Sequence, residues 1–378
     1  MWLISAPVIG QALRDINYNY LYSPDQPFFL KTTIVRSDTH WRVYVELSLK
    51  DTARQVSDYS MQHELRTALH EKEGKLLAGD SSAVLGKSYR LKSHCQVPVQ
   101  KETLVFVTKV TSTALKHAWY YYQILEPNYP VNAALFQRDV LITDYGKTNM
   151  EVNILGESLT AISFYDDFFP AATPPFDEAM ARVSAGLKVD STFFLPTGST
   201  TIIPHKQGLY LIQKDTLATT GVAFRAQTDY PRYNRVENLA DPLIYVCTKQ
   251  EFDRVKSAKG DKKAFDKVML SITQDTERAR QFVRSYFRRV ELANTFFTSY
   301  KEGWKTDRGM IYIIFGLPDE VFRFSDREIW NYKTYGKLSF TFVKSPSLFD
   351  PDNLVLVREK KFQEKWYEVI DLWRNARF

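Results

Sequence analysis

The stretch YKEGWKTDRGMIYIIFGLPDEVF, from Tyr300 to Phe322, decides how the C-terminal part of this chain is interpreted. Small, aromatic and charged residues follow one another directly before an apolar run: Gly303, Trp304, Lys305, Thr306, Asp307, Arg308 and Gly309. Such a composition suits either an active site or a structural corner. Local chemistry favours the corner. Gly303 follows a helical pattern, where a left-handed helix cap prefers glycine, and the Asp307 carboxylate can bond the amides of a tight turn.

The residues after this corner predict a strand and then a short helix. MIYIIFG is strongly apolar and predicts a buried strand that ends at Gly316. Pro318 is followed by two acidic residues, which is typical of a first helical turn. Proline suits the first helical position, and the helix dipole favours negative charge there. Trp330 then lies on the next predicted strand, EIWNY.

The flanking segments predict a helical arm and a small α+β domain over residues 246–378. Within residues 261–302, apolar residues recur three or four apart and predict two helices. Thr273 or Asp275 is the expected cap of the second helix. EIWNY and KLSFTFV alternate like paired strands, NLVLVRE adds another strand, and residues 362–378 predict a closing helix.

Two stretches before this domain predict β-sandwiches. Within residues 13–130, apolar and polar residues alternate in THWRVYVELSLK, which is the period of a strand with one buried face. Several such strands separated by turns favour an immunoglobulin-like sandwich. Residues 131–245 repeat the pattern and predict a second sandwich, while the proline-rich residues 168–176 cannot form a central strand. The predicted fold class is therefore multidomain and mainly β, with a helical arm and an α+β C-terminal part.

The first twelve residues predict the remnant of an export signal. An apolar run from Trp2 to Ile9 is followed by small residues at the spacing that suits signal peptidase, with cleavage after Ala12. No basic segment precedes the run, and a buried first strand is the alternative. The run is too short to span a bilayer. We therefore expect an exported protein that lies outside the cytoplasm.

Composition places few limits on ligands and partners. The formal net charge of +6, from 50 basic and 44 acidic residues, is small for 378 residues and does not by itself argue for nucleic acid. Cys95 and Cys247 fall in different predicted domains and favour reduced thiols over a disulfide. No two of the six histidines have the spacing of a helical zinc site, so we expect no metal and no cofactor.

The stretch GWKTD, residues 303–307, resembles the signature of the GWxTD domain. The resemblance extends upstream through ERARQFVRSYFRRVELANTFF and downstream through Gly316, Pro318 and the EIWNY strand. The N-terminal ALRDINYNYLYSPD is similar to the mature start of such proteins. The resemblance implies a cell-envelope protein of Bacteroidota or related bacteria, in which the domain follows β-rich regions. With the predicted export signal, it implies an extracytoplasmic protein that is periplasmic or associated with the outer membrane. It implies no catalytic residue.

Carboxylates and aromatic rings around the motif are the first candidate functional groups. Asp307, Asp319 and Glu328 flank one predicted strand and could converge as an acid–base pair. The favoured alternative is a turn cap, a helix-start charge and an exposed strand residue. Trp304 and Trp330, with Tyr312, could form a ligand platform. We favour core packing for these rings, because aromatic side chains dominate cores.

Two further patterns point to contact surfaces. Arg280, Arg284 and Arg288 lie four apart and predict a basic stripe on one helix, which is either solvated or docks the carboxylates of a neighbouring domain or acidic partner. HAWYYYQIL, residues 117–125, places aromatic rings on both faces of one strand. Contact between domains is the favoured explanation, and a partner or a sugar is the alternative.

These patterns together favour a non-catalytic exported cell-envelope protein that acts as a protein-interaction or scaffolding module. Its expected partners are other envelope proteins. We expect no nucleic acid and no transmembrane span, with peripheral membrane association open. Two alternatives stay open: an envelope hydrolase acting on peptide or glycan, and a carbohydrate-binding module.

Overall fold

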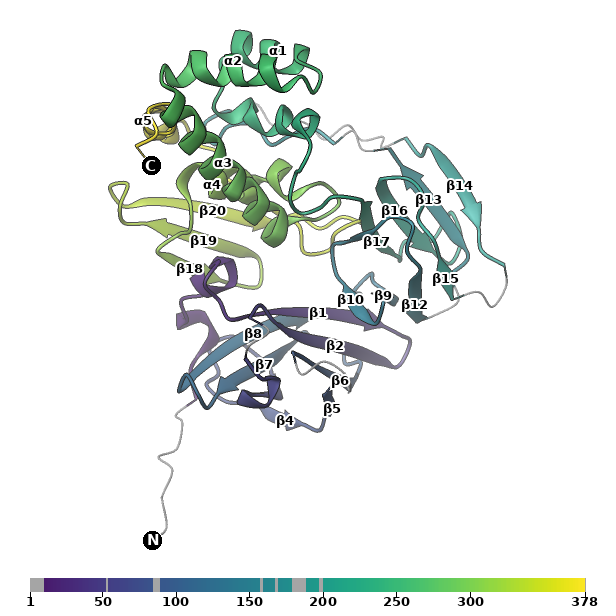
Figure 1. Ribbon diagram of the computed structural model, residues 1–378. Coiled ribbons are helices and arrows are strands. Elements are labelled where there is room, and N and C mark those ends of the chain that lie inside the picture. The colour runs from purple at the N-terminus through teal and green to yellow at the C-terminus, as the bar shows by residue number, and fades with distance from the viewer. Residues whose placement is uncertain are drawn as a thin grey trace.

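The computed structural model describes residues 10–51, 54–83, 89–156, 159–166, 169–178, 188–196 and 200–377. Most of the predicted signal segment, residues 1–9, lies outside these ranges. The described chain is multidomain and mainly β, and its C-terminal part combines helices with a sheet (Figure 1). Among the described residues, no helix is long and apolar enough to cross a membrane.

The first β-rich region is a sandwich of two antiparallel four-stranded sheets. Their strand orders are β1-β2-β6-β5 and β4-β3-β7-β8. The strands are β1 (Phe28–Arg36), β2 (His40–Leu49), β3 (Tyr59–Arg66), β4 (Lys75–Leu77), β5 (Asp80–Ala83), β6 (Arg90–Pro98), β7 (Leu104–Ser112) and β8 (His117–Leu125). The predicted alternation is confirmed in β2, where Trp41 and Val43 are buried and Arg42 is exposed. These apolar side chains share a core with Phe106 of the opposite sheet.

The second β-rich region also packs two sheets around one core, with orders β10-β9-β12-β15 and β11-β17-β16-β13-β14. The strands are β9 (Ala133–Gln137), β10 (Val140–Ile142), β11 (Tyr145–Lys147), β12 (Val152–Gly156), β13 (Ala161–Tyr165), β14 (Ser191–Phe194), β15 (Thr201–Ile202), β16 (Gly208–Gln213) and β17 (Val222–Gln227). Leu135 and Ile154 of one sheet meet Phe164 and Ile212 of the other. Of the proline-rich residues 168–176, the described residues 169–176 contain no strand, as expected.

The C-terminal part packs helices against an antiparallel sheet of order β18-β19-β20-β21. Its elements are α1 (Lys249–Ser257), α2 (Lys262–Thr273), α3 (Thr276–Phe297), α4 (Asp307–Phe315), β18 (Glu320–Arg323), β19 (Arg327–Tyr332), β20 (Leu338–Lys344), β21 (Leu354–Leu356) and α5 (Gln363–Arg374). The two predicted helices, the paired strands and the closing helix are confirmed. Asp275 caps α3 by accepting the Arg278 amide at 2.8 Å. Helix α1 was not predicted, although Thr248 and Glu251 start it with a capping box.

The strand predicted for MIYIIFG is wrong, because this segment forms helix α4. Thr306 caps it by accepting the Gly309 amide at 3.0 Å, and Gly316 ends it at a φ of +84°. No side chain from Met310 to Phe315 is more than 3% exposed. A helix buried on all sides is apolar on all sides. Periodicity therefore cannot separate it from a buried strand.

The short helix predicted at Pro318 is also wrong. Pro318 is buried, and the chain passes directly from it into strand β18. The Asp319 amide donates to the Asn331 carbonyl at 3.0 Å, which extends the ladder between β18 and β19. Pairing with a neighbouring strand therefore outweighs the local signals for a helix start.

The N-terminal segment before the first sandwich lies against the C-terminal sheet. The Tyr18 amide donates to the Val321 carbonyl at 2.8 Å, and the Val321 amide donates to Oδ1 of Asn17 at 2.9 Å. On β8, the face that carries Tyr120 and Tyr122 joins the same core as the C-terminal part. Contact between domains therefore explains the aromatic residues on both faces of this strand, as expected.

Candidate functional site at the GWKTD corner and the central cavity

Gly303 lies against helix α3 and does not form a left-handed cap. Helix α3 ends at Phe297, and Gly303 is not among the glycines with positive φ. A Cβ atom at Gly303 would lie 2.1 Å from the Ala293 carbonyl oxygen and 2.6 Å from the Asn294 Cα. The cap expected here is therefore wrong, and the glycine is needed because two backbones approach closely.

Trp304 is a buried core residue whose polar atoms all have partners. Its amide donates to Oδ1 of Asn294 at 3.0 Å, and its carbonyl accepts from the Tyr245 hydroxyl at 2.9 Å. The indole Nε1 donates to the Tyr233 hydroxyl at 2.9 Å, and the side chain is 3% exposed. Core packing is therefore its role, as favoured for the aromatic residues of the motif.

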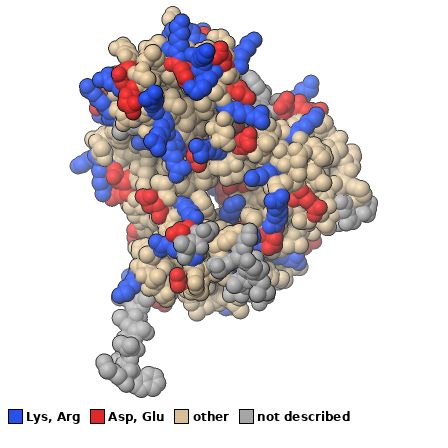
Figure 2. All heavy atoms as spheres, viewed as in Figure 1, with Lys and Arg blue, Asp and Glu red and all other residues tan. Residues whose placement is uncertain are grey.

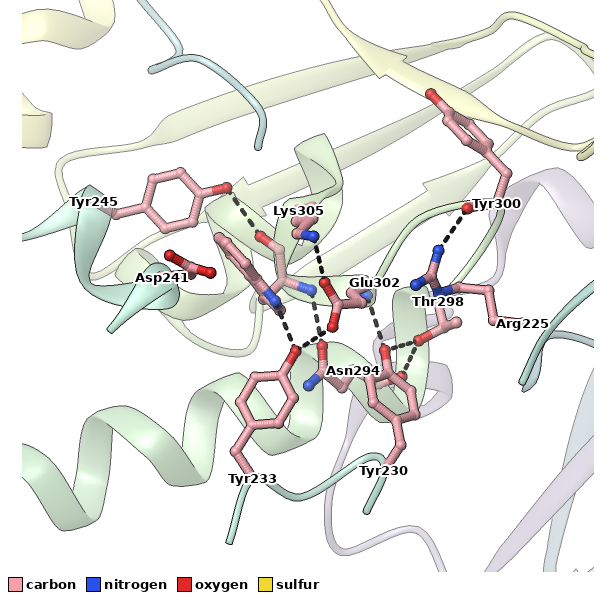
Figure 3. Close-up of polar contacts among 12 residues, drawn as sticks. Arg225, Tyr230, Tyr233, Asp241, Tyr245, Asn294, Thr298, Tyr300, Glu302 and Lys305 are labelled. Carbon is pink, nitrogen blue, oxygen red and sulfur yellow. Dashed lines mark hydrogen bonds and ion pairs between the residues drawn. The ribbon is translucent and has the colours of Figure 1, made fainter. Parts of the chain in front are cut away.

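A buried charged network lies beside Trp304, whose ring centre is 5.3 Å from Lys305 Nζ. Figure 3 shows Glu302 and Lys305 of this network pointing toward each other. Lys305 Nζ lies 2.6 Å from one carboxylate oxygen of Glu302, and the Tyr233 hydroxyl donates to the other at 2.6 Å. Burial disfavours the charged form of Glu302. The positive charges of Lys305 and Arg225 outweigh this effect of burial and hold the pKa of Glu302 below the ordinary value. Arg225 also donates to the Tyr300 carbonyl at 3.0 Å, which attaches β17 to the motif segment.

Tyr230 fixes the start of the motif. Its hydroxyl accepts the Gly303 amide at 3.1 Å and is also hydrogen-bonded to Thr298. Figure 3 shows Tyr230 and Tyr233 reaching the motif from the loop after β17. Burial raises the pKa of both tyrosines well above the ordinary value, so both stay protonated and can donate.

Asp307 is the first residue of helix α4 and holds a distant strand, so the turn cap predicted for it is wrong. One carboxylate oxygen accepts the Leu356 amide at 3.0 Å, and the other pairs with Arg358. Arg358 also donates to the side chain and carbonyl of Thr173, both at 3.1 Å. Asp307 therefore connects α4 to β21 and, through Arg358, to the proline-rich segment.

The three candidate carboxylates have separate partners. Asp319 accepts the Lys333 amide at 2.6 Å in the loop after β19. Glu328 is buried and accepts the Tyr22 hydroxyl at 2.7 Å and the indole Nε1 of Trp330. With Asp307 paired to Arg358, the described contacts do not bring these groups together as an acid–base pair.

Gly309 and Arg308 complete the motif in different ways. A Cβ atom at Gly309 would lie 1.8 Å from the Gly303 carbonyl oxygen, so the first turn of α4 needs glycine for space. Arg308 lines a central cavity instead. Its guanidinium donates to the Tyr22 hydroxyl at 3.3 Å and lies 5.4 Å from the centre of the Phe297 ring.

The central cavity has a volume of about 390 Å³ and lies where the three regions meet. β1 and β8, the edge strands of the two sheets in the first sandwich, supply one wall. Asp144, from the second β-rich region, and Asp350, from the loop after β20, also line it. Burial raises the pKa of Asp144 above its ordinary value and that of Asp350 to about 6.

The basic stripe is solvent-exposed on α3. Arg280 and Arg288 lie 3.4 and 3.2 Å from acidic residues of the same helix, and their side chains are 74% and 57% exposed. Arg284 is exposed between them. The stripe therefore docks no neighbouring domain through the contacts described.

Sequence reasoning missed the partners of the motif. Tyr230, Tyr233, Asn294 and Arg358 carried no local signal, because each acts through a contact with a residue distant in the chain. Among the described residues, no group of three or more His, Cys, Asp or Glu side chains could hold a metal ion.

The fold defines a multidomain, mainly β chain that ends in an α+β domain built around the GWKTD corner. Residues 208–375, a little less than half of the chain, match the family model of the GWxTD domain, so the C-terminal part carries a GWxTD domain. The match begins at β16 and includes Arg225, Tyr230 and Tyr233, which contact the motif segment. No curated protein matches the chain.

Proposed function

We propose that this protein is a non-catalytic, exported protein of the cell envelope that acts as an interaction or scaffolding module. The observation that carries the proposal is how the GWKTD groups are used. Gly303 packs against α3, Trp304 bonds Asn294 and Tyr233, and Asp307 bonds β21 and Arg358. These groups hold segments that are distant in the chain in place. This use supports a motif that maintains the fold, and with it the surface that the domain presents to a partner.

The chemistry of Asp307 supports a structural role for the motif. A general base must lose and accept a proton during a reaction. Protonating Asp307 would remove the charge that pairs with Arg358, whose side chain is 15% exposed. Leaving a buried cation without its partner is costly, so this carboxylate is better suited to holding β21 than to carrying protons.

The basic stripe on α3, consisting of Arg280, Arg284 and Arg288, is the surface we assign to a partner. Lys and Arg side chains gather over the helical part at the top of Figure 2. The stripe's ion pairs on its own helix are exposed, and such pairs contribute little. An acidic partner can therefore compete for these arginines, and its charge would steer the encounter.

Export is supported by the apolar run from Trp2 to Ile9 and the small residues that follow it. The predicted mature chain begins at Leu13. Intact-mass measurement of the protein purified from native cells tests this start, and fractionation of the same cells tests the compartment. A cytoplasmic product that retains Met1 would contradict export.

Cross-linking in native cells, followed by purification of the tagged full chain and mass spectrometry, tests the partner surface. The test variant replaces the three stripe arginines with glutamate. The matched control replaces three exposed lysines of α2, Lys262, Lys263 and Lys267, with glutamate. We expect the stripe variant to lose an acidic partner that the control retains. Equal capture by both variants would contradict an interaction through this stripe.

A further inference from the structure

The central cavity has the size and position of a ligand site. Its volume of about 390 Å³ falls within the usual range for small-molecule pockets. A second cavity of about 150 Å³ shares Arg308, Arg323 and Gln123 with it. The two cavities therefore meet at these side chains, between the first sandwich and the C-terminal part.

Arg308 has donors available in this cavity. A guanidinium has five N–H donors, and Arg308 donates to the Tyr22 hydroxyl at 3.3 Å. It makes no ion pair within 4 Å of a described residue. By contrast, Arg358 of the same domain bonds Asp307, Thr173 and the Leu356 carbonyl. Arg308 is therefore suited to bind acceptor oxygens from outside the chain.

Both acceptors and donors line the cavity together with Arg308. Asp144 uses one carboxylate oxygen to accept from Thr143 at 2.7 Å, and its other oxygen accepts no side-chain bond from the described residues. The Gln123 side chain, which offers both a donor and an acceptor, has no hydrogen bond to the described part of the chain and lines both cavities. These groups come from the first and second β-rich regions, while Arg308 comes from α4.

The balance of charge selects a neutral ligand. Besides Arg308 and Arg323, the cavity is lined by Lys31 and Lys50, and besides Asp144 and Asp350 it is lined by Asp352. An anion and a cation would therefore each meet side chains of their own charge as well as of the opposite charge. Sugar hydroxyls both donate and accept hydrogen bonds, so they suit a wall that mixes the two. Aromatic rings from Tyr121, Tyr300 and Phe349 also line the cavity and offer the apolar faces against which sugar rings pack.

We propose that the central cavity binds a short neutral oligosaccharide, with Arg308, Asp144 and Gln123 bonding its hydroxyls. The site goes beyond the proposed function, which requires no ligand in this cavity. Failure of sugar binding would therefore leave the stripe and its partner test unaffected. The three regions that meet at the cavity would each contribute one of these groups.

Calorimetric titration of the full chain with maltohexaose, cellohexaose, chitohexaose, xylohexaose and mannohexaose tests the proposal. We expect at least one of them to bind. Arg308→Ala should weaken binding by about tenfold or more, since a hydrogen bond to a charged group contributes that much. Gln123→Ala should weaken it by about two- to tenfold, since a hydrogen bond between neutral groups contributes less. Arg280→Ala, which removes an exposed arginine from α3, is the matched control and should bind as wild type does.

Gln123→Ala keeps the test decisive if Arg308→Ala fails to fold, because Gln123 bonds no described side chain. Melting curves of each variant report folding separately from binding. Binding of none of the five sugars by the folded wild type would overturn the proposal. Unchanged affinity in both cavity variants would overturn it as well. So would Arg308-dependent binding of hexaglutamate without binding of any sugar, because that result identifies an acidic peptide site.

Discussion

Replacing Gly303 with alanine tests the close approach that defines the GWKTD corner. The new Cβ would lie 2.1 Å from the Ala293 carbonyl oxygen, where real contacts are no shorter than 3.0 Å. The motif segment or α3 must therefore move by at least 0.9 Å, the difference between 3.0 and 2.1 Å. Both neighbours are backbone, so no flexible side chain can absorb the shift.

The movement would also strain two buried hydrogen bonds. These are the Gly303 amide to Tyr230 at 3.1 Å and the Trp304 amide to Asn294 at 3.0 Å. Overpacking costs about 1–3 kcal/mol, and each lost bond costs about 0.5–1.5 kcal/mol. Gly303→Ala should therefore destabilise the C-terminal part by about 2–6 kcal/mol.

Urea unfolding of the full chain, followed by tryptophan fluorescence, measures this loss. Four of the seven tryptophans lie in the C-terminal part and report on it: Trp304, Trp330, Trp366 and Trp373. Gly303→Asn separates the close approach from a left-handed cap. Asparagine tolerates positive φ, so it would be mild at a cap, but it carries the same Cβ and should be as harmful as alanine here.

Gly336 supplies the matched control. It has a φ of +76°, and a Cβ there would meet no atom within 4 Å. Gly336→Ala should lower the free energy of unfolding by about 1 kcal/mol, because alanine disfavours the left-handed backbone conformation at this position. Gly336→Asn should lower it less, because asparagine tolerates that conformation better. The reasoning about Gly303 is refuted if Gly303→Ala unfolds like wild type, or if asparagine restores the stability that alanine removes.

Three further predictions concern charged groups. Asp307→Asn should cost about 2–4 kcal/mol in urea unfolding, because it leaves the Arg358 cation without its carboxylate; a mild effect would indicate a simple acceptor role. Hydrogen bonds from Arg374 hold the pKa of Glu251 at about 2, against an ordinary 4.5, so its stabilisation is present above pH 4.5 and is lost as the pH falls toward 2. Glu251→Gln should reduce the dependence of the melting temperature on pH between pH 2 and pH 4.5. The same dependence in wild type and variant would contradict this. Burial raises the pKa of Asp350 from 3.8 to about 6, so its contribution to stability is greatest below pH 3.8 and is lost as the pH rises through 6. Asp350→Asn should melt above wild type at pH 8, and a lower melting temperature there would count against a buried, destabilised carboxylate.

Several elements could be predicted because their signals are local. Alternation in THWRVYVELSLK identified β2, and the Asp275 cap with the apolar spacing after it identified α3. The paired strands β19 and β20 followed from the same period of two. These patterns depend on which side of a single element is buried. The order of apolar and polar residues within that element is enough to predict its buried side.

The sequence by itself determined that a corner lies at residues 303–309 and that both its glycines and its charges matter. Only the tertiary structure decided what each group contacts. Gly303 needs space because Ala293 lies against it, and Asp307 acts on β21 rather than on its own turn. The segment after the corner forms helix α4, and the sequence could not distinguish this helix from a strand because it is buried on all sides, where periodicity carries no information. The central cavity depends on contacts among regions far apart in the chain, and the physical reason is the same: no local pattern encodes which distant surface will cover a given side chain.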